Sequence, residues 1–307
     1  MGKLVSGRAE DKEYLCSLWQ QVFEDSVDYI KCFFEYYYQD ENVYIWKEKD
    51  EITTVLYALP AEIRIPSELW ILPEMQNPAK KDKCSRTLQA YYLYAIATVP
   101  KYRGNHYLEQ MLPALKEKLG EDSILFLVPE KEVIPYYESL GFMCRRAASG
   151  RKSESRRENN VENRAENQTE NQTENQTETG IEILPLSDPV LYKKLRNQAF
   201  ADSAYVAWDE HEIAYAMEEI RESGGEVYLI RSREKEDLSD GYMEKEYLLA
   251  GYIEKECLFH VVETTLPMNL QDKVLKKLHC NKFYREELIY MLDRELDTDL
   301  YLSFALN

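Results

Sequence analysis

The chain of 307 residues lacks the patterns that mark several common classes of protein. Its six cysteines form no Cys-x-x-Cys pair and its four histidines are scattered, which fits neither a disulfide framework nor a zinc site. We therefore expect free, mostly buried thiols in a reducing cytoplasm, and no bound metal. No apolar run approaches the roughly 18 residues of a membrane-spanning helix, so no membrane span is expected.

Excess positive charge is missing as well. The formal net charge is −18, which argues against a nucleic-acid partner. Acidic residues are concentrated in the C-terminal part, residues 181–307. An acidic surface can attract a cationic amine substrate, and it can equally serve solubility alone.

The first residues, MGKLVSGRAED, have no long apolar core, so we expect no signal peptide. Gly2 and Ser6 match the myristoylation pattern, but a first strand over Lys3–Glu10 is the favoured interpretation.

A polar stretch from Arg151 to Gly180 divides the chain. It repeats the letters NQTE three times in tandem and contains almost no apolar residue. Such a segment cannot bury enough surface to offset its ordering entropy. We therefore predict a disordered linker over residues 151–180, between a first domain of residues 1–150 and a second of residues 181–307.

The first domain has alternating strand and helix patterns. The strands are expected at Lys3–Glu10, Asn42–Glu48, Ile52–Ile65, Gln89–Val99, Ser123–Val128 and Phe142–Arg146. The helices are expected at Asp11–Glu24, Ser26–Asp40, Tyr107–Leu119 and Val133–Leu140. Pro66–Thr87 is expected to be a long loop, and Pro113 is expected to kink its helix. This order predicts a mixed α/β fold.

The second domain repeats the front of the first, with two helices followed by consecutive strands. Its helices are expected near Pro189–Phe200, Asp209–Glu222 and Leu270–Leu278. Strand patterns lie near Glu226–Arg231, Leu248–Glu254, Cys257–Glu263 and Tyr301–Leu306, with a further segment near Leu288–Leu292. We expect this domain either to cover a substrate cleft or to form a homodimer surface.

The segment YYLYAIATVPKYRGNHYLEQMLPALKEKL combines an apolar strand, a Pro-Lys-Tyr-Arg-Gly turn and a helix. That order places a helix N-terminus at the end of a buried strand, where free backbone N–H groups and the helix dipole can hold a phosphate. Arg103, Gly104 and Asn105 supply a positive charge, flexibility and free amides. An ordinary strand-to-helix turn could carry the same letters.

Two motifs resemble those of the GCN5-related N-acetyltransferases. IATVPKYRGNHYLEQML resembles the acetyl-coenzyme A motif, and LFLVPEKEVIPYYESLGF resembles the later motif of the same superfamily. The resemblance covers roughly Leu4 to Arg146. It implies a mostly antiparallel, twisted sheet flanked by helices, with the second domain a smaller, degenerate unit of the same kind.

The resemblance also implies roles for particular residues, with acetyl-coenzyme A as co-substrate. The backbone of Ala97, Thr98 and Val99 would pair with the pantetheine arm. The turn would wrap the pyrophosphate, through Arg103, Gly104, Asn105, His106, Tyr107 and Leu108. Tyr137 would protonate the leaving thiolate, as a phenol near the sulfur can.

Two positions depart from the family pattern, because His106 replaces the middle glycine and Leu108 the final small residue. A side chain at His106 could crowd the pyrophosphate. The sequence therefore supports two hypotheses, an N-acetyltransferase acting on a primary amine in a ternary complex, or a non-catalytic acyl-coenzyme A-binding or interaction protein. The general base stays open between Glu62, Glu130, Asn307 and a water chain.

Overall fold

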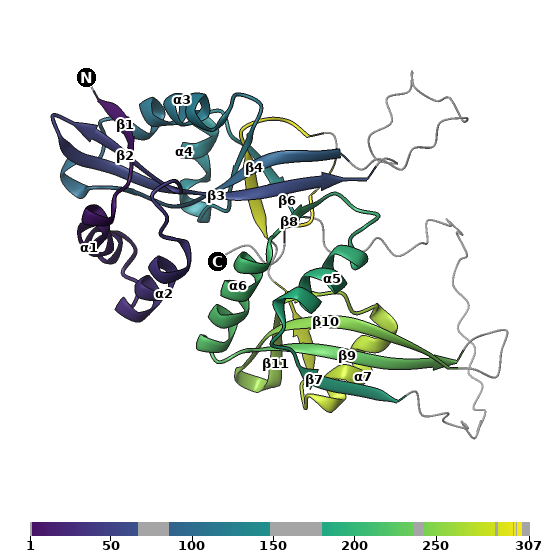
Figure 1. The fold of residues 1–307 in the computed structure, drawn as a ribbon. Helices are drawn as coiled ribbons and strands as arrows, with labels where there is room; N and C mark the ends of the chain where they lie inside the picture. The colour runs from purple at the N-terminus through teal and green to yellow at the C-terminus, as the bar shows by residue number, and fades with distance from the viewer. Residues whose placement is uncertain are drawn as a thin grey trace, which may run out of the picture.

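The computed structural model describes residues 2–66, 86–147, 180–235, 242–285, 288–296, 298 and 300–302, and Figure 1 shows their arrangement. The predicted linker, apart from Gly180, and most of the predicted Pro66–Thr87 loop lie outside these residues.

The first sheet has eight strands, seven of them in the order β1-β2-β3-β4-β5-β13-β6, and β8 pairs with β3 beyond the end of β2. Only the β4–β5 pair within it is parallel. The strands are β1 (Lys3–Ser6), β2 (Val43–Glu48), β3 (Glu51–Ile65), β4 (Arg86–Thr98), β5 (Ile124–Leu127), β6 (Met143–Arg146), β8 (Tyr205–Ala207) and β13 (Ile289–Leu292).

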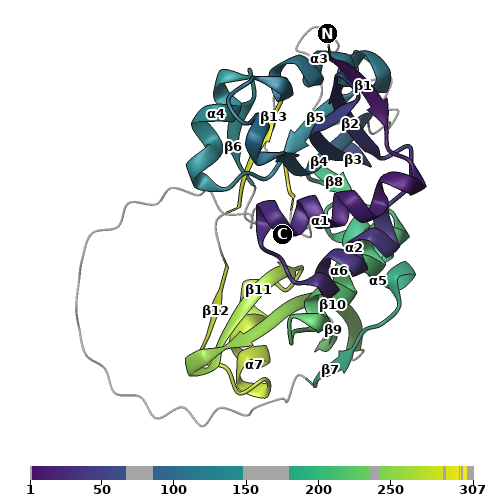
Figure 2. The ribbon, with the colours of Figure 1, turned by 90° about the vertical axis from the view of Figure 1, so that its left-hand side faces the viewer.

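Two strands of this sheet come from beyond the polar stretch. In β13, Met291 lies opposite Leu127 on one side and Cys144 on the other, as Figure 2 shows for the strands. In β8, Val206 lies opposite Ile63 of β3. The C-terminal part of the chain therefore completes the first sheet. The domain boundaries at residues 150 and 180 stay a prediction.

A second sheet of five strands has the order β12-β11-β10-β9-β7. Neighbouring strands within this sheet pair antiparallel, except for the parallel β11–β12 pair. The strands are β7 (Ile181–Pro185), β9 (Glu226–Lys235), β10 (Tyr242–Glu254), β11 (Leu258–Thr264) and β12 (Lys282–Tyr284). Together the two sheets confirm the predicted mixed fold with mostly antiparallel pairing and flanking helices.

Seven α-helices flank the two sheets among the described residues. They are α1 (Lys12–Phe23), α2 (Val27–Tyr37), α3 (Tyr107–Leu119), α4 (Ile134–Ser139), α5 (Pro189–Ala199), α6 (Glu210–Glu222) and α7 (Met268–Lys277). Ser26 caps α2 by accepting from the Tyr29 N–H at 3.1 Å, as its sequence position predicts. Asp209 and Glu212 form a capping box at α6. Helix α3 has the predicted bounds and runs through Pro113 without a break.

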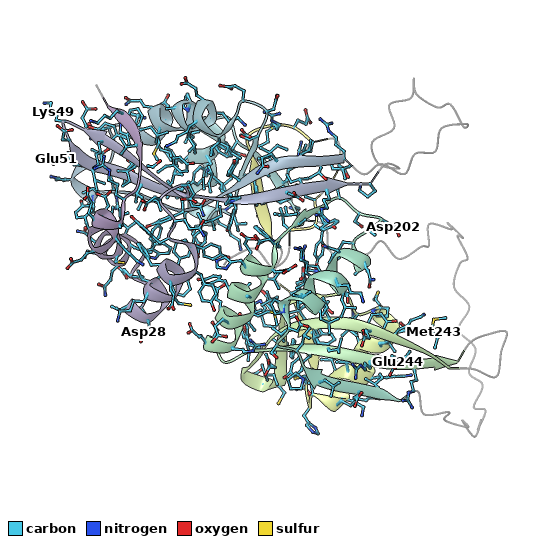
Figure 3. The ribbon with its side chains drawn as sticks, viewed as in Figure 1. Asp28, Lys49, Glu51, Asp202, Met243 and Glu244 are labelled. Atoms are coloured by element: carbon cyan, nitrogen blue, oxygen red, sulfur yellow. The ribbon has the colours of Figure 1, made fainter. Side chains whose placement is uncertain are left out.

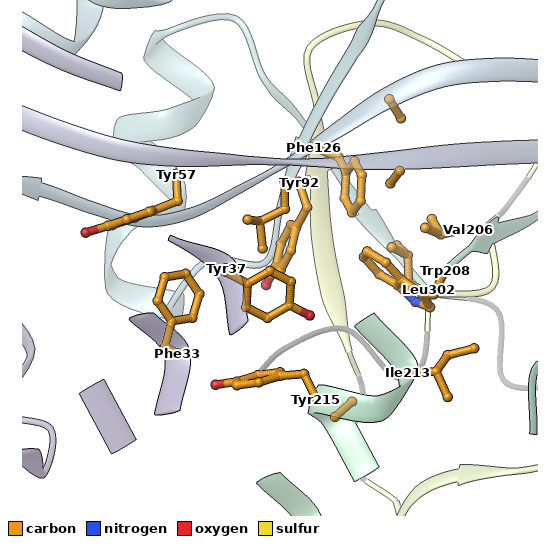
Figure 4. Packing of buried hydrophobic residues seen from close by; sticks show 14 of the residues in the cluster. Phe33, Tyr37, Tyr57, Tyr92, Phe126, Val206, Trp208, Ile213, Tyr215 and Leu302 are labelled. Atoms are coloured by element: carbon orange, nitrogen blue, oxygen red, sulfur yellow. The ribbon is translucent and has the colours of Figure 1, made fainter. Parts of the chain in front are cut away.

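The helices cover both faces of the first sheet. On one face, α3 packs Leu108, Met111 and Leu115 against strand residues. On the other face, α1 and α2 share one core with α6 of the C-terminal part. Figure 4 shows Phe33 and Tyr37 of α2 beside Tyr215 of α6, with Tyr37 and Tyr215 ring centroids 4.8 Å apart. Since this shared core buries large aromatic and aliphatic side chains from both parts of the chain, the two parts stabilise each other.

Some strands differ from their predicted extent. The first strand ends at Ser6 instead of Glu10, because a 3₁₀ turn over Ala9–Asp11 leads into α1. The predicted terminal strand contributes only a bridge between Tyr301 and Tyr205 among the described residues. No helix in the described ranges is both long and apolar enough to cross a membrane.

Candidate active site

Strands β4 and β5 pair over only three residues and then separate. The pairing runs from Ala90 opposite Ile124 to Tyr92 opposite Phe126, while β4 itself continues to Thr98. A bulge in β4 accompanies the separation, because Ala95 and Ile96 of β4 together lie opposite the single residue Leu56 of β3. Ala95 at the bulge has a φ of 44°, which is rare for a residue with a side chain. Strained backbone of this kind often accompanies a functional site.

A cavity of about 1160 Å³ lies at this separation. One wall is β4 from Tyr92 to Ile96, and the facing wall is the end of β5 and the following segment to Val133. The C-terminal part closes the remaining side with residues of α6, β10 and β11 and with Arg285, Leu288 and Ile289. Neither part of the chain forms the cavity alone.

The turn that follows β4 is held in place by residues of the neighbouring strand β3. Val99 donates its N–H to Thr53 O at 2.9 Å and accepts from the Tyr102 N–H at 2.8 Å. Both backbone groups of Val99 are therefore engaged inside the protein. The side chains of Lys101 and Tyr102 bind Glu51, which Figure 3 shows at the outer end of the β2–β3 pair. The turn is thus fixed relative to the sheet.

The start of α3 presents unpartnered backbone amides. Among the described residues, the N–H groups from Gly104 to Glu109 have no recorded acceptor, and Gln110 is the first to bond back, to His106 O at 3.3 Å. Gly104 has a φ of +79°, and a Cβ added there would meet no atom within 4 Å. Unpaired amides at a helix N-terminus attract anions. The Arg103 side chain is exposed beside them.

His106 adopts the left-handed conformation that precedes α3, with a φ of 56°. Its Nδ1 lies 3.3 Å from Glu109 Oε2, and the imidazole is 72% exposed. The ring is therefore held on the flank of the helix, away from the open space next to Gly104. Leu108 is buried in the core below. Its side chain serves packing while its backbone N–H remains in the unpartnered group.

Tyr137 of α4 lines the cavity. Its ring packs edge-on against Phe142 with centroids 6.0 Å apart. Burial, with a smaller contribution from Tyr136, raises the pKa of Tyr137 to about 12, so the phenol keeps its proton at neutral pH. No hydrogen-bond partner of its hydroxyl is recorded in the described part of the chain. The structure thus places a neutral phenol on the cavity wall.

Other residues of the cavity escaped the sequence analysis. The Tyr29 hydroxyl lies 2.6 Å from that of Tyr94 and donates to Glu219 Oε1 at 3.2 Å. Burial, and then the charges of Glu222 and Asp25, raise the pKa of Glu219 to about 7 against the lowering effect of the Tyr29 bond. Glu219 lies three residues after Ala216 on the buried side of α6, and that position was the available sequence signal.

The proposed glutamate bases have different surroundings. Glu130 lines the cavity from the segment after β5. Glu62 is paired with Arg64 at 3.0 Å on β3 and is not part of the cavity wall. Asn307 lies outside the described residues. The described residues contain no group of three or more side chains suited to holding a metal ion.

Comparison with known proteins places the fold. No family model matches the sequence, and no curated protein matches it. Among solved structures, a GCN5-related N-acetyltransferase from Anabaena variabilis is similar with a TM-score of 0.61 and 11% identity, over 95% of this chain and 72% of that one. One from Kribbella flavida gives a TM-score of 0.57 and 12% identity, over 95% and 71% of the two chains. A probable N-acyltransferase from Enterococcus faecalis gives 0.59 and 11%, over 95% and 72%. The chain therefore has the fold of the GCN5-related N-acetyltransferases.

Proposed function

We propose that the protein is an acetyl-coenzyme A-dependent N-acetyltransferase that acetylates a primary amine by direct attack in a ternary complex. The observation that carries this proposal is the separation of β4 from β5, which leads along β4 into the unpartnered amides of α3. A parted strand pair can accept an extended pantetheine arm, and amides at a helix start can accept a diphosphate.

The residues of the two motifs take defined roles in this proposal. The backbone of Ala97 and Thr98 faces the pantetheine arm, whereas Val99, with both groups engaged, positions the turn. The amides from Gly104 to Leu108 hold the pyrophosphate, together with the charge of Arg103. The open space at Gly104 and the lateral position of His106 leave room for this contact.

The chemistry requires a neutral amine and a protonated leaving group. The amine attacks the thioester carbonyl, whose oxygen is polarised by a backbone N–H, and the sulfur departs. Tyr137 donates its proton to that sulfur, since its raised pKa keeps it protonated. None of the cysteines among the described residues lines the cavity, which favours direct transfer over an acyl-enzyme.

Two measurements separate this proposal from a non-catalytic binder. The purified full chain should gain thermal stability with acetyl-coenzyme A, because a ligand stabilises the state it binds. It should then release free thiol when polyamines, aminoglycosides or peptides are added. Stabilisation without thiol release on any acceptor would favour the binding protein. No stabilisation at millimolar ligand would reject the acetyltransferase and favour an interaction protein.

A further inference from the structure

The cavity contains one carboxylate that is partly buried and supplied by the C-terminal part of the chain. Glu219 projects from α6 toward α2 and β4, across the boundary between the two parts. Asp25 also lines the cavity, but its Oδ2 accepts from Trp19 Nε1 at 2.8 Å. Glu130 and Glu132 are exposed on the segment after β5. Glu219 is therefore better shielded from water than Glu130 and Glu132, and it is not bound to Trp19 as Asp25 is.

Hydrogen bonds orient this carboxylate. Tyr29 donates to Glu219 Oε1, so Tyr94 must donate to Tyr29 to complete the 2.6 Å bond between the two hydroxyls. No partner is recorded for Glu219 Oε2 among the described residues. One oxygen is thus held by Tyr29, which Tyr94 and Tyr215 contact in turn, while the other remains available to a ligand in the cavity.

The walls next to Glu219 are aromatic. Trp19, Tyr29 and Tyr94 line the cavity on its side, with Trp19 and Tyr94 ring centroids 5.9 Å apart. Aromatic faces beside a carboxylate attract organic cations. Tyr92, Glu219 and Tyr137 all line this same cavity, so the carboxylate and the phenol of the later motif face one shared space.

We propose that Glu219 binds the ammonium group of the acceptor through its available oxygen and takes the proton that must leave before the amine can attack. This inference rests on the proposed acetyltransferase function. It makes the C-terminal part a contributor to catalysis, with Tyr29 and Tyr94 as positioning residues.

The proton and electron movements balance. Glu219 takes one proton from the ammonium, and the freed lone pair forms the new C–N bond to the thioester carbon. The C–S bond then breaks, and the sulfur leaves with its electron pair and takes the phenol proton of Tyr137. The amide nitrogen sheds its second proton, which restores Tyr137 through water, and Glu219 releases its own proton to solvent.

The pH dependence follows from the surroundings of Glu219. The titratable groups that face it are Tyr29, Cys32 and Tyr37 of α2, Tyr92 and Tyr94 of β4, Asp25 after α1, and Tyr215 and Glu222 of α6. The tyrosines stay neutral, since burial raises the pKa of each. The rate should therefore rise with pH through the Glu219 pKa of about 7.

The test compares Glu219→Gln with Glu218→Gln in the full chain. Glu218 precedes Glu219 on the same helix, lies near Arg221 at 3.7 Å and does not line the cavity. Three quantities are measured, namely acetyl-coenzyme A affinity, the pH profile of kcat with spermidine and Nα-acetyl-lysine methyl ester, and spermidine affinity by calorimetry at pH 6 and pH 8.5.

We expect Glu219→Gln to lower kcat by at least about 100-fold, as loss of a general base does, and to remove the rise near pH 7. Acetyl-coenzyme A affinity should not change in either variant. Wild-type protein should bind spermidine about tenfold more tightly at pH 8.5 than at pH 6, because the ionised fraction rises by that factor. Glu219→Gln should abolish this difference. Tyr29→Phe should move the rise to higher pH, since the Tyr29 bond lowers the Glu219 pKa.

The contrary results are distinct. A Glu219→Gln rate within twofold of wild type, with the same pH profile, would overturn the role of Glu219 while leaving the acetyltransferase standing. Wild-type protein that does not bind acetyl-coenzyme A would refute the proposed function, and with it this catalytic role. Equal spermidine affinity in wild type and Glu219→Gln at pH 8.5 would show that Glu219 does not bind the ammonium group, whether or not the protein is an acetyltransferase.

Discussion

Replacing Glu219 by Gln should stabilise the protein at alkaline pH. The carboxyl pKa is raised from 4.5 to about 7 in the folded protein, first by burial. A raised carboxyl pKa means that the folded state binds the proton more tightly than the unfolded state, so stability falls as pH rises between these values. At about 1.4 kcal/mol per pKa unit, the free energy of unfolding of the wild type at pH 8.5 is about 3 kcal/mol lower than at low pH, where the carboxyl is protonated. The Gln variant has no such loss and keeps the Tyr29 bond.

The assay is urea unfolding of both proteins at pH 5 and pH 8.5, with Glu218→Gln as control. Most of the loss occurs above pH 5, so the stability advantage of Glu219→Gln should grow by about 2–3 kcal/mol between the two pH values. Glu218→Gln should show no comparable growth. An advantage that is the same at both pH values, or absent at pH 8.5, would refute the argument that burial opposes the charge of Glu219.

Further substitutions test the buried ion pair of the C-terminal part and the proposed general acid Tyr137. Arg196 binds Glu263 at 3.0 Å with both side chains fully buried, so Arg196→Met should cost about 3–5 kcal/mol by leaving a buried carboxylate without its cation. Arg231→Met, which breaks an exposed pair with Glu246, should cost under about 1 kcal/mol, and equal losses in urea unfolding would contradict this contrast. Tyr137→Phe should lower kcat about 100-fold or more while leaving acetyl-coenzyme A affinity unchanged in calorimetry, and an unchanged kcat would reject Tyr137 as the acid.

Local patterns predicted the elements around the turn well. Helix α3 has the predicted bounds, because its apolar spacing and the terminal Gly120 are local signals. The bulge at Ala95 was not predictable, since alanine has no preference for positive φ and the conformation is imposed by neighbouring strands. His106, which could crowd the pyrophosphate, occupies a left-handed position and its imidazole pairs with Glu109. Histidine is among the residues that more often adopt that conformation.

Contacts between residues far apart in the sequence could not be predicted from local patterns. The sequence singled out a segment near residues 288–292 without a strand assignment, because its pairing between β5 and β6 depends on residues more than 140 positions away. The same holds for Glu219, whose position on an apolar helix face was visible although its tyrosine partners were not. Functional groups contributed by a distant part of the chain leave no local pattern, because their partners are brought close only by the packed core.

Calorimetric titration of acetyl-coenzyme A into wild type, Gly104→Ala and Gly120→Ala tests the amide site at α3 most directly. Both glycines have positive φ and open space around them, at opposite ends of α3, so both substitutions strain the backbone alike. We predict binding of one equivalent by wild type and Gly120→Ala, and affinity weakened about tenfold or more in Gly104→Ala, where backbone N–H groups would hold the diphosphate. Absence of binding by wild type, or equal affinity of the two variants, would contradict the account.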